Sequence, residues 1–322
     1  MIVIWHVYCH FLVKCHETPT VTQSMFALSI FLPMHVDLFV LISGYFGIKH
    51  ILKKLIDTYL VMVFYLLVIA VLFWSFDWQM IFLPFSHGPW WFMRTYVYLL
   101  LLAPILNFVS DTMAKSYGWK AILIPILVLN EYFSFTWHDL YLGHFGFDLL
   151  NFVTVYFLGR YLASESFERW CCFHLYKKNR PWLSWLIIFL IVQIIRLIYY
   201  QVVSGLGINT HNWDYNNPLN IISAITFFQL LRNVSVSGNW VYFFSSSAVA
   251  VYLVTEHPYV LPKLEAMFFL LYGKISATST IGGLLYCFLF AFLSYLAVAL
   301  FDKLRIPVQT CISGQILPHV NK

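Results

Sequence analysis

One stretch of the sequence decides how the rest is interpreted: His35–His50 reads HVDLFVLISGYFGIKH. Within it, Asp37 stands among valine, leucine, phenylalanine and isoleucine, and the run ends in glycines and a basic turn. Burying a carboxylate without a partner costs several kcal/mol, so Asp37 must be neutralised or paired. Ser43, Gly44 and Gly47 are small residues that let another helix approach closely. The stretch therefore predicts an embedded helix, tightly packed at its end, with a polar residue that needs a partner.

The composition of the whole chain is that of a membrane protein. Its 322 residues are 61% hydrophobic, 20% aromatic and only 10% charged, and the mean hydropathy is +0.76. Soluble domains carry about 25% charged residues, so lipid is the expected solvent of this chain. We predict an all-α fold, a polytopic transmembrane helix bundle of about ten helices that forms one membrane-embedded domain over residues 1–322. The predicted helical windows are 1–13, 25–48, 55–76, 90–110, 119–136, 145–163, 181–204, 219–233, 237–256 and 279–301.

Two of these windows are unusual. The window 1–13 is shorter than the about 20 residues that a bilayer crossing needs, so we expect either that this helix is partial or that the true start lies upstream. It also lacks the basic start and the small-residue cleavage site of a signal peptide. The window 237–256 carries three consecutive serines, at 245–247, and is predicted to be only half embedded.

Lysine and arginine gather in alternate loops, as the positive-inside rule describes for membrane proteins. On the predicted boundaries, 14 of the 19 basic residues fall on one side of the membrane. Both termini are therefore predicted to be cytoplasmic, and the loops 77–89, 137–144 and 205–218 to be external. The 14 residues are Lys49, Lys53, Lys54, Lys115, Lys120, Arg160, Arg169, Lys177, Lys178, Arg180, Arg232, Lys303, Arg305 and Lys322.

Charge and cysteine content exclude several other classes of protein. The formal charge of +5 is explained by cytoplasmic loops, so no nucleic-acid partner is expected. The six cysteines, at 9, 15, 171, 172, 287 and 311, show no CxxC or metal spacing, and we expect neither a disulfide framework nor a metal site.

His6 and His10 are polar residues within the apolar window 1–13, so their presence needs an explanation. They are four residues apart, so on a helix they share one face. Three interpretations are open: a metal-binding pair, interfacial histidines satisfied by a neighbouring helix, or a general base or nucleophile at His6. Helical rise places His6 about 12 Å and Asp37 about 18 Å below the same face. We therefore predict that Asp37 orients His6 in an acid–base dyad, with a simple helix-packing hydrogen bond of Asp37 as the alternative.

Further polar residues lie toward the predicted membrane surfaces. Lys53 and Lys54 are either a positive-inside anchor or a phosphate contact for a nucleotide-bearing donor. Trp91 and Arg94, at the outer end of the window 90–110, are candidates for binding an acceptor. The alternatives are that Trp91 belongs to the interfacial aromatic belt and that Arg94 snorkels outward to the membrane surface. Glu256 lies at another external end, and we assign it, with His10, to the same acceptor-binding group.

The order of these landmarks resembles the bacterial membrane acyltransferases of family 3, in particular the polysaccharide O-acetyltransferase branch. The resemblance runs almost end to end, and its more specific parts are the first-helix histidine and the second-helix signature. The matching stretches are Met1–His6, Val36–Phe46, Trp90–Phe92 with Pro104, Tyr156–Leu162, Tyr215–Leu219 and Val251–Pro258.

The resemblance implies an acyl-CoA donor, a sugar hydroxyl as acceptor, and an essential histidine that corresponds to His6. It also implies that the basic turn at Lys53 and Lys54 binds the donor. The chain departs from the family pattern in two places: no arginine precedes His6 by about ten residues, and Thr255 stands where many members have histidine.

Taken together, the sequence predicts an integral-membrane O-acyltransferase of the bacterial cytoplasmic membrane. It is expected to transfer an acyl group, acetyl being the favoured case, from acetyl-CoA or another acyl-CoA to a cell-surface polysaccharide or lipid-linked sugar, without a bound cofactor. His6 either removes the hydroxyl proton or carries the acyl group itself. A transporter or flippase is the alternative, although we find no inverted repeat in the sequence. A polymerase is a third class, and it would more often carry a large external loop.

Overall fold

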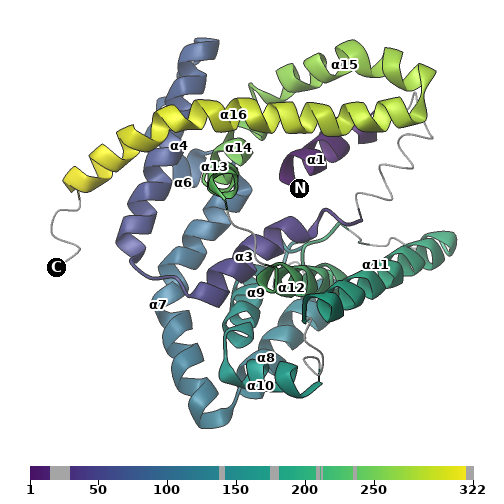
Figure 1. Cartoon of the computed structure of the whole chain (residues 1–322). Coiled ribbons are helices and arrows are strands. Elements are labelled where there is room, and N and C mark those ends of the chain that lie inside the picture. The colour runs from purple at the N-terminus through teal and green to yellow at the C-terminus, as the bar shows by residue number, and fades with distance from the viewer. Residues whose placement is uncertain are drawn as a thin grey trace. The chain divides into compact units, whose positions relative to one another are not determined.

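The computed structural model describes residues 1–14, 30–137, 142–174, 181–207, 211, 213–234 and 238–316. In these ranges every regular element is a helix, which confirms the all-α prediction (Figure 1). The elements are α1 (Ile2–His6), η1 (Val7–Phe11), η2 (Leu12–Lys14), α3 (Met34–Phe46), α4 (Ile51–Phe73), α5 (Trp78–Phe82), α6 (Pro84–His87), α7 (Trp91–Tyr117), α8 (Lys120–Leu127), η3 (Val128–Thr136), α9 (Leu149–Leu162), α10 (Glu165–His174), α11 (Pro181–Gly205), α12 (Pro218–Arg232), α13 (Asn239–Ser245), α14 (Ala248–Thr255), α15 (Leu261–Thr278) and α16 (Thr280–Ile316).

Each predicted window contains a helix, but several features differ from the prediction. Helices α5, α6, α10 and α15 lie outside the predicted windows. The window 237–256 is broken between α13 and α14 at Ser246 and Ser247, where its serines had suggested partial embedding. Helix α15 was not predicted, because Lys263, Glu265 and Lys274 dilute its hydropathy. Residues 25–29 of the second window lie outside the described residues. The same holds for four members of the orientation count, namely Lys177, Lys178, Arg180 and Lys322.

The chain carries the features of a membrane protein. Four described helices, α4, α7, α11 and α16, are long and apolar enough to cross a membrane. In α11 the polar side chains of Gln193 and Arg196 are buried, whereas Ile187, Leu190 and Ile194 are exposed. This arrangement, polar inside and apolar outside, is expected when lipid surrounds a helix. The count of about ten spans and the side on which the termini lie stay predictions.

The chain divides into two compact units, each built from separate segments. Unit 1 comprises Met1–Leu32, His50–Arg94 and Val236–Lys322, and unit 2 comprises Pro33–Lys49 and Thr95–Ser235. The expectation of a single domain is not tested by this division.

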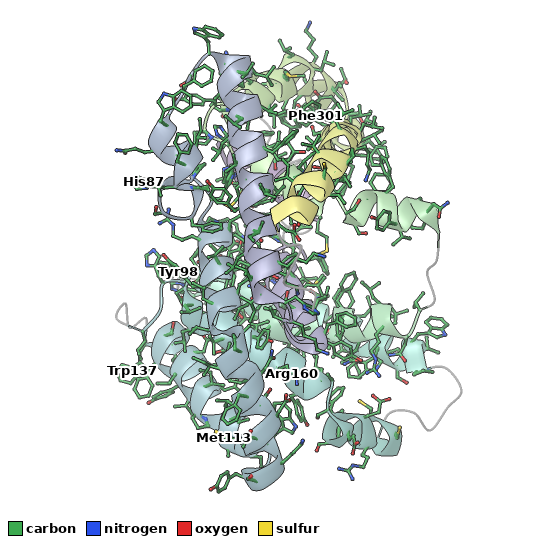
Figure 2. All side chains as sticks on the ribbon, turned by 90° about the vertical axis from the view of Figure 1, so that its left-hand side faces the viewer. His87, Tyr98, Met113, Trp137, Arg160 and Phe301 are labelled. Carbon is green, nitrogen blue, oxygen red and sulfur yellow. The ribbon has the colours of Figure 1, made fainter. Side chains whose placement is uncertain are left out.

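In unit 1 the long helix α16 packs along α15, α14 and α4 (Figure 1). The Phe301 ring of α16, labelled in Figure 2, belongs to this packing, and its centroid lies 6.2 Å from that of the Phe64 ring of α4. Near this contact, buried Asp302 accepts hydrogen bonds from Tyr65 (2.7 Å) and from Arg305 (2.6 Å). This paired carboxylate joins α16 to α4 within the unit.

Unit 2 is organised around a close crossing of α3 and α9. A side chain on Gly44 would collide with the backbone oxygen of Tyr156, and one on Gly159 would collide with the backbone oxygen of Leu41. The prediction of tight packing at the end of the signature helix is therefore confirmed. Just beyond the crossing, Arg160 of α9 forms an ion pair with Asp111 of α7 at 2.5 Å (Figure 2 labels Arg160).

Candidate active site

His6 stands at the junction of two kinds of helix. Helix α1 ends at His6, and the chain continues through the π-helical turn Val7–Phe11, which carries His10. The two rings remain neighbours, with centroids 5.6 Å apart. Isolated π turns are frequent at functional sites. His6 is buried, with 5% of its surface exposed.

Both nitrogens of the His6 ring have partners in α14 and at its end. Nδ1 lies 2.9 Å from Oγ1 of Thr255, and Nε2 lies 2.8 Å from Oε1 of Glu256. The Thr255 hydroxyl donates to the carbonyl oxygen of Val251 at 2.7 Å. Because a hydroxyl has only one proton, Thr255 accepts from His6, and Nδ1 carries a hydrogen.

A second proton of the His6 ring environment lies at Nε2. Nε2 of His6 and Oε1 of Glu256 are within hydrogen-bond distance, so a proton lies between them. It either makes an imidazolium that faces a carboxylate or a carboxylic acid that faces a neutral imidazole. In both forms the pair is electrically neutral, which reduces the cost of burying it.

Glu256 serves both histidines. Its Oε1 also lies 2.8 Å from Nε2 of His10. Glu256 is the C-cap of α14, where the helix dipole disfavours a negative charge, so contacts with two imidazoles offset an unfavourable position. The exposed fraction of the side chain rises from 6% for His6 through 20% for Glu256 to 30% for His10.

Aromatic side chains of unit 1 form a wall beside these residues. The Tyr252 ring is 6.2 Å from the His6 ring and 5.6 Å from the Phe92 ring. Trp90, which is buried, donates its indole N–H to the carbonyl of Leu253 at 2.9 Å and so holds the start of α7 against α14. These aromatic rings make the surroundings of His6 apolar on the side that faces Tyr252.

His257 follows Glu256 and differs from the other two histidines. Burial lowers the pKa of His257 to about 4, so its ring is neutral at pH 7. Its Nδ1 accepts a hydrogen bond from the backbone N–H of Tyr259 at 3.3 Å. Within the described ranges, no group of three or more histidine, cysteine, aspartate or glutamate side chains has the arrangement of a metal site.

The remaining predicted site residues of unit 1 lie on other elements. Trp91 begins α7, and the exposed Arg94 donates to the carbonyl of Gly88 at 3.3 Å. Lys53 and Lys54 are exposed in the first turn of α4. The assignment of these four side chains to donor or acceptor binding stays a prediction.

Asp37 lies in unit 2, where it is fully buried. Its Oδ1 accepts a hydrogen bond from Nδ2 of Asn151 in α9 at 3.2 Å, which is the helix-packing alternative considered from the sequence. His6 belongs to unit 1, and its pairing with Asp37 stays a prediction. Oδ2 of Asp37 and both Nε and Nη2 of Arg196 have no hydrogen-bond partner among the described residues.

The sequence placed His6 and His10 on one helix face and grouped His10 with Glu256 in acceptor binding, and the structure brings all three side chains together at Oε1 of Glu256. Thr255 was noted only as a departure from the family pattern, and its contact with His6 was not predicted. The available signal was the polar pair Thr255-Glu256 at the end of an apolar run, directly before His257. Polar residues at an embedded helix end need partners, and the histidines of the first helix were free to supply them.

A comparison with protein-family models matches residues 1–301 to the acyltransferase domain of family 3. The chain belongs to acyltransferase family 3. This match and the apolar helices identify a membrane acyltransferase. Searches of the curated proteins and of the solved structures gave no significant match.

Proposed function

We propose that this acyltransferase is an O-acetyltransferase of the bacterial cytoplasmic membrane. It takes an acetyl group from acetyl-CoA and transfers it to a hydroxyl of a cell-surface polysaccharide or a lipid-linked sugar. The observation that carries the proposal is the buried His6, held through both ring nitrogens in a chain of this family. An imidazole is suited to this reaction because it exchanges protons near neutral pH.

In the proposed reaction, the acceptor hydroxyl gives its proton to Nε2 of His6 as its oxygen attacks the acyl carbon. The C–O bond of the ester forms, the C–S bond of the thioester breaks, and the thiolate is protonated by solvent. In the second route, Nε2 of His6 first takes the acyl group and then passes it to the hydroxyl. Both routes need His6 held in one tautomer, which Thr255 favours by accepting from Nδ1.

The substrates are assigned to the two ends of the membrane domain. Lys53 and Lys54 supply positive charge for the phosphates of acetyl-CoA, and they are exposed at the start of α4. Trp91 and Arg94 are assigned to the acceptor. Membrane lipid surrounds the helices, as the exposed isoleucine and leucine side chains of α11 suggest.

The test compares cells with and without the gene. Two quantities are measured, namely the amount of surface polysaccharide and its content of ester-bound acetyl groups. We expect unchanged polymer that has lost acetyl groups. Loss of the whole polymer would indicate a transporter or flippase instead, and unchanged acetyl content would contradict the proposal.

A further inference from the structure

We propose that Glu256 and His10 form a proton relay between His6 and the surface, and that this relay activates His6. The inference rests on the proposed function, and it changes the part assigned to two residues. The sequence placed His10 and Glu256 in acceptor binding, whereas their contacts point to work on the proton of His6.

The first step of the argument is the occupied position at Nε2 of His6. Nδ1 is engaged by Thr255, so Nε2 is the ring atom left for chemistry. In the structure, Glu256 and the shared proton occupy Nε2. His6 can act as a base or nucleophile only when that proton has left.

The second step is the direction in which the proton can leave. Oε1 of Glu256 contacts both Nε2 of His6 and Nε2 of His10, at 2.8 Å each. Exposure of the side chain rises along the series His6, Glu256, His10. An imidazole can take a proton on one nitrogen and release one from the other. In its Nδ1–H tautomer, His10 can therefore accept the proton at Nε2 and release the other proton from Nδ1 to water. Exchange with water at the exposed ring then restores that tautomer.

The third step is the consequence for His6. After the proton has left, a carboxylate faces the lone pair of Nε2, and the two repel each other. The contact opens, and Nε2 becomes available to the acceptor hydroxyl or the acyl carbon. The hydroxyl proton later returns to the pair and leaves by the same route, while solvent supplies the proton for the thiolate. The overall reaction therefore neither gains nor loses a proton.

Two His10 variants test the relay. His10→Gln retains an amide N–H that can donate to Glu256, but it cannot carry a proton. His10→Ala removes the side chain and leaves space for added imidazole. The assay uses the full-length protein in membranes, acetyl-CoA labelled in its acetyl group, and the polysaccharide fraction of the host as acceptor. His87→Ala is the matched control, because His87 is an exposed histidine of the same unit.

We expect kcat to fall about 100-fold in both variants, at the lower end of the effect of one positioned acid–base group, while KM for acetyl-CoA and acceptor stays unchanged. Imidazole should restore the rate of His10→Ala, because it replaces the missing proton carrier. It would not restore a rate that was lost because the protein had unfolded. A normal rate in His10→Gln would show that only the hydrogen bond matters and would overturn the relay. A raised acceptor KM with unchanged kcat would return His10 to acceptor binding. A wild-type protein without acetyl transfer would overturn the proposed function and the relay together.

Discussion

Glu256 in unit 1 and Asp37 in unit 2 are both carboxylates in largely apolar surroundings, and their partners differ. Glu256 contacts two histidines at hydrogen-bond distance and is 20% exposed. Asp37 is fully buried, has one amide donor and keeps one oxygen without a partner among the described residues. Arg196 attracts Asp37 electrostatically, but the two side chains form no ion pair in the described part of the chain. A carboxylate surrounded by titratable partners is suited to proton transfer, whereas an isolated one mainly affects stability.

The largest effect that can break this comparison is expected at His6. His6→Ala should lower acetyl transfer by about 100- to 10,000-fold, because it removes the acid–base group itself. The amount of protein in the membrane should stay unchanged. Acetyl transfer is measured as the acetyl content of the polysaccharide, and the amount of protein is measured by immunoblotting. His87→Ala is the control. Full activity in His6→Ala would show that His6 and its contacts with Thr255 and Glu256 are not needed for the reaction.

Comparing kcat of Glu256→Gln with kcat of Asp37→Asn tests which carboxylate is the partner of His6. Glu256→Gln should lower kcat by about 100-fold, because the amide cannot accept the shared proton. Asp37→Asn should leave kcat within about threefold if Glu256 is the partner of His6, because the Asp37 carboxylate then takes no part in the proton transfer. The reverse ranking would favour the His6–Asp37 dyad predicted from the sequence.

A double-mutant cycle tests whether Asp37 and Arg196 compensate each other. Arg196→Met and Asp37→Asn should each lower the free energy of unfolding by about 1–3 kcal/mol, since each removes the opposite charge that attracts the remaining buried group. The double variant should lose less than the sum, with a coupling of about 1–2 kcal/mol. Denaturant unfolding in detergent gives these values. Strict additivity would mean that the two charges do not stabilise each other.

The smallest effect is expected at Thr255. Thr255→Val keeps the shape but removes the acceptor for Nδ1 of His6, which should cost about 1 kcal/mol and lower kcat about fivefold. Thr255→Ser keeps the hydroxyl and should stay near the wild-type rate. Equal rates for the two variants would show that the tautomer of His6 does not depend on this hydroxyl.

Much of this organisation could be predicted because it depends on local properties. The apolar windows predicted the helices, since a chain in lipid must satisfy its backbone hydrogen bonds within each segment. The small residues Gly44 and Gly47 indicated a close helix contact, and Gly44 makes it. Helix α15 was missed because its charges lowered the average hydropathy, although a helix tolerates charges on an exposed face.

The sequence by itself determined that the chain is helical, that it has the composition of a membrane protein and that His6, His10, Asp37 and Glu256 need partners. Those conclusions follow from composition and spacing. Only the tertiary structure decided which partners they have. His6 and Thr255 are 249 residues apart in sequence, and Asp37 and Asn151 are 114 apart, so no periodicity relates them. The physical reason is that helix packing, not helix formation, selects which buried polar groups meet.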